Sequence, residues 1–105
     1  MVTEKVDTQE KVNDYELIVI FKGDLSEEKL TAAIENVKKY ITGKTGVISD
    51  TKSWGKRRLA YPIKHFNEGN YILFKFTMKP NLNRELETSL RISEDVLRHL
   101  LVKID

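Results

Sequence analysis

The chain has 105 residues, of which 40% are hydrophobic and 9% aromatic, and this size suits one small domain with one core. It contains no cysteine, which excludes disulfides, thiolate metal sites and cysteine nucleophiles. No apolar run approaches the roughly 20 residues of a membrane span, and the first residues do not form a secretion signal. We therefore expect a soluble, cytoplasmic protein.

Charge is unevenly distributed along the chain. Eighteen basic and sixteen acidic residues leave a net charge of only +2. The first fourteen residues, however, carry more acidic than basic side chains, so the rest of the chain is more basic than the total suggests. The stretch from Lys52 to His65 contains several lysines and arginines and no Asp or Glu. Its local field could attract phosphate groups.

The first predicted strand follows a polar N-terminal segment. Residues 1–13 show no sustained apolar periodicity, which indicates a disordered extension ahead of a single domain of residues 14–105. From Tyr15 to Phe21 β-branched and aromatic residues alternate, which predicts a central strand. One face would carry Leu17, Val19 and Phe21, and the other Ile18 and Ile20.

A helix is predicted after Gly23. Asp24 and Glu27 have the spacing of a capping box, and Ser26 is an equally good N-cap. Gly43 is placed to end the helix in a left-handed conformation. The apolar stripe of this helix consists of Leu30, Ala33, Ile34, Val37, Tyr40 and Ile41.

Two strands come next. The segment Val47 to Ile63, rich in Thr, Ser and aromatic residues with Gly55 inside it, predicts a long bulged strand. Lys64 to Gly69 would form the turn, and Asn70 to Met78 alternates clearly as a strand. We expect Ile72, Phe74, Phe76 and Met78 in the core, with Tyr71, Leu73, Lys75 and Thr77 on the opposite face.

A second helix and a last strand complete the predicted order. Pro80 stops the preceding strand, and Asn81 or Asn83 could cap the helix. After a turn at residues 93–95, residues 96–104 form the last strand. Its two alternating sets would be Val96, Leu100, Val102 and Ile104 on one face, and Leu97, His99, Leu101 and Lys103 on the other.

The order strand, helix, strand, strand, helix, strand predicts an α+β fold of the ferredoxin-like, split β-α-β type. Four antiparallel strands would form the sheet, with both helices on one face. The other face would then be uncovered. An apolar patch formed there by Ile18, Ile20, Tyr71 and Leu73 is a candidate binding surface.

Catalytic and metal-binding motifs are missing from the sequence. The five glycines are isolated, so no phosphate-binding loop is formed, and no hydrolase signature occurs. The two histidines, His65 and His99, have no partner at metal-ligand spacing. We predict no enzymatic activity, metal, cofactor or small-molecule substrate.

RNA recognition fits the composition better. The RNA-recognition motif has this topology and stacks bases on aromatic residues, but Leu73 occupies one of the stacking positions, which favours a protein partner for the open face. The segment Trp54 to Ile63 could direct arginines at phosphates. The alternative is that its aromatic residues pack the hairpin while its charges keep an edge strand soluble, and residue composition does not decide between the two.

Several motifs resemble those of the bacterial small-subunit ribosomal protein six family. They are Tyr15-Glu-Leu17, Trp54-Gly-Lys-Arg-Arg-Leu-Ala-Tyr-Pro-Ile63, Glu68-Gly-Asn-Tyr71, Leu90-Arg-Ile92 and Val102-Lys103. The resemblance extends from about Tyr15 to Ile104. Asn70 departs from it, since many members have an aromatic residue there.

The resemblance implies a structural protein of the small ribosomal subunit, without catalytic activity, that binds small-subunit ribosomal RNA as a heterodimer with ribosomal protein eighteen during assembly. A non-ribosomal ferredoxin-like regulatory or protein-interaction module is the alternative. The residues implied for RNA contact are Lys56, Arg57, Arg58, Arg98 and Lys103. Those implied for the partner surface are Tyr15, Ile18, Trp54, Tyr61, Tyr71 and Leu73.

Overall fold

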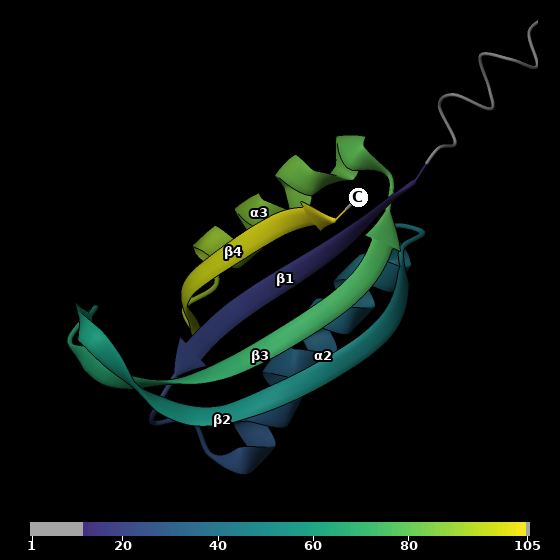
Figure 1. Ribbon diagram of the computed structural model, residues 1–105. Coiled ribbons are helices and arrows are strands. Elements are labelled where there is room, and N and C mark those ends of the chain that lie inside the picture. Colours follow the sequence, from purple (N-terminus) through teal and green to yellow (C-terminus); the bar gives the residue numbers. More distant parts are fainter. Residues whose placement is uncertain (1–11, 105) are drawn as a thin grey trace, which may run out of the picture.

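The computed structural model describes residues 12–104, which form a four-stranded antiparallel sheet with two α-helices behind it (Figure 1). The strand order is β2-β3-β1-β4, so β2 and β4 are the edges. The predicted ferredoxin-like arrangement is confirmed. The elements are β1 (Asn13–Lys22), α2 (Glu27–Gly43), β2 (Val47–Ile63), β3 (Phe66–Met78), a 3₁₀ turn (Pro80–Leu82), α3 (Asn83–Ile92) and β4 (Val96–Ile104).

The prediction of a disordered N-terminal extension falls almost wholly outside the described residues. Of its thirteen residues only Val12 and Asn13 are described, and Asn13 is already the first residue of β1, opposite Met78. No helix in the described part of the chain combines the length and the apolar character that a membrane crossing requires.

The core lies between the sheet and the two helices. Inward residues of β1 and β3 alternate as the sequence predicted, and the helices cover them with their apolar stripes. The central members, all fully buried, are Leu17, Val19, Phe21, Ile72, Phe74, Phe76 and Met78 from the strands, with Ile41 and Leu86 from the helices.

The ends of α2 confirm one prediction and correct another. The N-cap is Ser26, whose hydroxyl accepts a hydrogen bond of 3.2 Å from the backbone of Lys29. The left-handed residue at the C-terminus is Thr45, with φ of 67°, and not Gly43, which still belongs to the helix. The turn comes later because Gly46 passes close to Ile41 and donates a 2.9 Å hydrogen bond to its carbonyl oxygen.

The predicted asparagine cap of α3 is wrong. The helix starts directly from the 3₁₀ turn, with Leu82 in the N-cap position and no side chain capping it. Asn83 instead directs its side-chain amide into the molecule, where it donates a hydrogen bond of 2.9 Å to the hydroxyl of Tyr15. A tertiary contact therefore takes the side chain that could have capped the helix.

The hairpin formed by β2 and β3 is longer than predicted. β3 begins at Phe66 rather than Asn70, and only Lys64 and His65 form the turn. Both have positive φ, 50° and 71°, the two-residue geometry whose twist matches that of paired strands. The predicted bulge in β2 is confirmed, because the register shifts between Ser53 and Gly55 and Gly55 has φ of 83°.

A bulge in β4 changes its predicted faces. Arg98 pairs with Ile20, but the next residue of β1, Phe21, pairs with Val96, so one residue of β4 is extra. Val96 consequently faces the core although Leu100 faces outward and is 57% exposed. The prediction that these two residues share a face is therefore wrong.

Candidate nucleic-acid interface

The open face of the sheet carries an apolar hollow of about 340 Å³. Its floor is formed where outward residues of the three neighbouring strands β3, β1 and β4 lie side by side. The predicted patch was right about Ile18, Ile20 and Tyr71. The full lining is Ile18, Ile20, Trp54, Tyr71, Arg98, His99 and Leu100.

A second, shallower hollow adjoins the first at the base of the long hairpin. Trp54 and Tyr71 line both hollows, and Arg57 and Arg58 complete the second. Both arginines are exposed, and Nε of Arg57 donates a hydrogen bond of 3.2 Å to the carbonyl oxygen of Trp54. We call residues 54–71 the basic hairpin. Its two arginines thus lie directly beside the apolar hollow of the open face.

The far part of the basic hairpin bends toward β4. A guanidinium nitrogen of Arg98 donates a hydrogen bond of 2.7 Å to the hydroxyl of Tyr61. Lys64, at the turn, donates from Nζ to the carbonyl oxygen of Val96 at 3.4 Å. The hairpin therefore contacts the opposite edge strand of the sheet, beyond the end of β1.

The five residues predicted to contact RNA fall into two places. Lys56, Arg57 and Arg58 are exposed together on the hairpin, and Arg98 is joined to that hairpin through Tyr61. Lys103 lies near the other end of β4, opposite Tyr15 of β1. The structure thus brings four of the predicted residues into one region and leaves the fifth apart from them.

The predicted partner residues divide in a similar way. Ile18, Trp54 and Tyr71 line the open-face hollow. Leu73 also faces that side but is only 8% exposed, because Ile18 and Lys52 flank it on the two neighbouring strands.

The prediction that Tyr15 belongs to the partner surface is wrong. It is only 3% exposed and packs in the core against the ring of Phe76, with 5.8 Å between the ring centroids. The physical reason is the alternation of β1, which places Tyr15 on the same side as Leu17.

Sequence reasoning missed two features of the site. Leu100 contributes to the open-face hollow. It lies two residues after Arg98, which faces outward, so alternation from Arg98 places it on the open face, whereas alternation from the buried Val96 places it in the core. The hydrogen bond between Arg98 and Tyr61 has no local signal, because it depends on how the hairpin bends.

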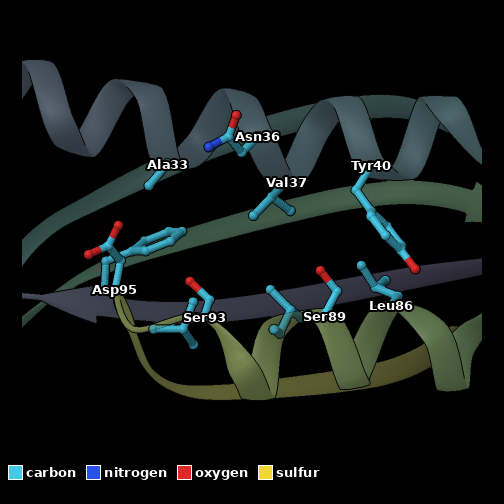
Figure 2. A pocket seen from close by; sticks show the side chains of 11 residues that line it. Ala33, Asn36, Val37, Tyr40, Leu86, Ser89, Ser93 and Asp95 are labelled. Atoms are coloured by element: carbon cyan, nitrogen blue, oxygen red, sulfur yellow. The ribbon is translucent and has the colours of Figure 1, made fainter.

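A groove on the other side of the sheet, between α2 and α3, has a volume of about 260 Å³ (Figure 2). Asp95 and Tyr40 lie at its opposite ends, with small polar side chains such as Asn36 and Ser89 along its walls (Figure 2). Asp95 is the single carboxylate of the lining.

Within residues 12–104, no three His, Asp or Glu side chains group so that they could hold a metal ion. His99 contacts one acidic residue of α3, since its Nε2 lies 3.5 Å from Oε2 of Glu87.

Comparison with known proteins identifies the family. The family model described as ribosomal protein S6 matches residues 14–103. The small ribosomal subunit protein bS6 of Dehalococcoides mccartyi is 43% identical over 96 residues, covering 91% of this chain and 88% of that protein. The bS6 protein of Caldanaerobacter subterraneus is 40% identical over 90% of this chain and 99% of its own.

A solved structure agrees with these relatives. The crystal structure of 30S ribosomal protein S6 from Thermotoga maritima superposes with a TM-score of 0.84 at 32% identity, covering 90% of this chain and 89% of that one. The chain therefore belongs to the ribosomal protein S6 family, whose members are structural proteins of the small ribosomal subunit and not enzymes.

Proposed function

We propose that the chain binds small-subunit ribosomal RNA through the basic hairpin and pairs with ribosomal protein eighteen through the apolar hollow of the open face. The observation that carries this proposal is the continuity of the two surfaces, which share Trp54 and Tyr71. Family membership disfavours the alternative of a non-ribosomal interaction module.

The chemistry of the basic hairpin suits phosphate. Arg57 and Arg58 are exposed, and a guanidinium group can form two parallel hydrogen bonds to one phosphate. The carbonyl oxygen of Trp54 restrains Arg57 through its Nε, so the remaining nitrogens of that guanidinium can face a ligand. Such contacts supply affinity, and the shape of the folded RNA supplies selectivity.

The open-face hollow suits a protein partner. Leu100 is 57% exposed and Trp54 is 42% exposed, and both line the same hollow. Apolar side chains gathered in one exposed patch, unlike ones scattered singly, mark interaction surfaces. Aromatic residues at the centre of a hollow, with charged residues at its border, are typical of protein interfaces. Two modest surfaces, one from each protein, would then act together on one RNA region.

A salt titration of RNA binding tests the RNA part. The complex of this chain with ribosomal protein eighteen is mixed with small-subunit ribosomal RNA at several salt concentrations. For Arg57→Ala with Arg58→Ala we expect weaker binding and a slope of log affinity against log salt that is smaller by about 1.5, since two phosphate contacts are lost.

The matched control replaces two exposed lysines of α2, Lys29→Ala with Lys39→Ala, on the opposite side of the sheet. It changes the net charge equally. If the control reduced the affinity and the slope as much as the arginine variant did, the effect would come from net charge alone, and the proposed RNA surface would be wrong.

A further inference from the structure

The basic hairpin extends past the end of its neighbouring strand. The pairing of β1 with β3 ends at Lys22 opposite Gly69, whereas β2 and β3 extend farther (Figure 1). They pair at Arg58 opposite Glu68 and again at Ile63 opposite Phe66, with a register shift between these two pairs. A two-stranded ribbon is only marginally stable in water by itself. Arg57 lies opposite Gly69, the last residue of β3 that still pairs with β1, and Arg58 is the first residue of β2 beyond that level. The direction in which Arg58 points therefore depends on contacts between the ribbon and the rest of the molecule.

Several contacts hold this ribbon. Leu59 is buried near Gly69, and the side-chain amide of Asn70 donates to the carbonyl oxygen of Lys22 at 2.9 Å, so the base of the ribbon is fixed. The far part is held by two hydrogen bonds, from Lys64 to the carbonyl oxygen of Val96 at 3.4 Å and from Arg98 to Tyr61 at 2.7 Å. Lys22 also places its Nζ 5.8 Å from the centroid of the Phe66 ring.

The contact between Arg98 and Tyr61 is the stronger of the two far hydrogen bonds. It is short, its donor is charged, and it joins residues 37 positions apart. Tyr61 follows Arg58 by only three residues on the same strand. A displacement of the Tyr61 side chain therefore moves the backbone that carries the arginine pair.

We infer that Tyr61 and Arg98 are positioning residues, whose hydrogen bond holds the basic hairpin in the orientation in which Arg57 and Arg58 meet RNA. The inference rests on the proposed function and assigns Arg98 a different role from direct RNA contact. Its guanidinium acts by ordering the hairpin before RNA binds, which lowers the entropy lost on association.

The test uses the full chain with Tyr61→Phe, which removes one hydroxyl and keeps the ring. In the free protein, hydrogen exchange of the backbone amides of residues 57–66 should become about fivefold faster, since one charge-assisted hydrogen bond is lost, while exchange in the core strands stays the same. Tyr40→Phe, on the helix side, is the matched control and should leave exchange of the hairpin unchanged.

RNA binding separates positioning from direct contact. With ribosomal protein eighteen and small-subunit ribosomal RNA, Tyr61→Phe and Arg98→Gln should each weaken binding about threefold to tenfold without changing the salt slope. The double variant should be no weaker than either single variant, because both changes break the same contact. A slope that falls by about 0.7 to 0.9 in Arg98→Gln alone would show a direct phosphate contact and overturn the inference.

Two failures are distinguishable. Unchanged hairpin exchange in Tyr61→Phe would refute the positioning contact itself, whether or not the protein binds RNA. Failure of the wild-type pair to bind ribosomal RNA, with faster hairpin exchange still seen in Tyr61→Phe, would refute the proposed function and with it the RNA role of this contact.

Discussion

The side-chain amide of Asn83 donates a hydrogen bond of 2.9 Å to the hydroxyl of Tyr15, 68 positions away. This bond joins the first turn of α3 to strand β1. Asn13 donates to the same hydroxyl at 3.3 Å. Tyr15 therefore brings a polar group into the core and pairs it there. The alternation of β1 directs Tyr15 into the core, and this contact explains why Asn83 does not cap its helix.

Tyr15→Phe should destabilise the fold without affecting the open face. The amide of Asn83 loses its acceptor in a partly buried place, so we expect the free energy of unfolding to fall by about 1 to 2 kcal/mol. Urea unfolding measures this change. Adding Asn83→Leu should restore part of the loss, because the amide of Asn83, which lost its acceptor, is then removed. A double variant as unstable as the sum of both single changes would contradict the role of this hydrogen bond.

The faces of β1 and β3 were predictable from the sequence because they depend only on local alternation, as in Leu17 and Val19 or Phe74 and Phe76. The faces of β4 could not be predicted in this way. One extra residue near Leu97 exchanges the inward and outward side chains before and after it, and no residue there marks the bulge.

The candidate site divides in the same way. Trp54, Arg57 and Arg58 belong to one motif of the sequence, and the structure brings Tyr71 of β3 beside them at the base of the basic hairpin. The link from Tyr61 to Arg98 was not predictable, since it requires the ribbon to bend across the end of β1. The burial of Tyr15 follows from alternation along β1, which excludes the partner contact that the family resemblance implies for this residue.

Gly23→Ala should be far more harmful than Gly43→Ala. A Cβ on Gly23 would lie 2.6 Å from the carbonyl oxygen of Glu68, a backbone atom that cannot swing aside. We expect a loss of about 1 to 3 kcal/mol in the free energy of unfolding. A Cβ on Gly43, the last residue of α2, meets nothing within 4 Å. That change should stabilise by about 0.5 kcal/mol, because alanine has the better helix propensity.

Thermal unfolding of the two glycine variants beside the wild-type protein checks this contrast. Equal losses in the two variants would mean that the close approach of Glu68 to Gly23 is not a constraint on the fold.

The ion pair between Lys44 and Glu85 should contribute to stability in a defined pH range. The two side chains lie 3.1 Å apart and join the end of α2 to the start of α3. Hydrogen bonding and attraction to Glu85 raise the pKa of Lys44 above its ordinary value of 10.5. Because the folded pKa is the higher one, this stabilisation is complete below pH 10.5 and is lost as the pH rises through the folded pKa.

Urea unfolding of Glu85→Gln and wild type between pH 7 and 11 measures that dependence. The difference in unfolding free energy should be constant up to about pH 10 and shrink above it. Glu94→Gln, an exposed residue of the turn before β4, is the control and should show no such alkaline change. A difference that disappears already near pH 8 would contradict the assignment to Lys44.

Leu100→Ser should separate partner binding from folding. Leu100 is 57% exposed in the open-face hollow, so its loss should change the free energy of unfolding by less than about 0.5 kcal/mol. Binding to ribosomal protein eighteen should weaken about tenfold, because an exposed apolar side chain of the proposed interface is replaced by a polar one. Isothermal titration calorimetry with the purified partner measures the affinity.

Ile92→Ser provides the matched control for this variant. Ile92 is also an exposed aliphatic residue, 75% exposed, but it ends α3 on the helix side of the sheet. Its substitution removes a similar apolar area from the surface and should leave partner affinity unchanged. If Ile92→Ser weakened binding and Leu100→Ser did not, the partner would dock on the helix side, and the open face would not be its binding surface.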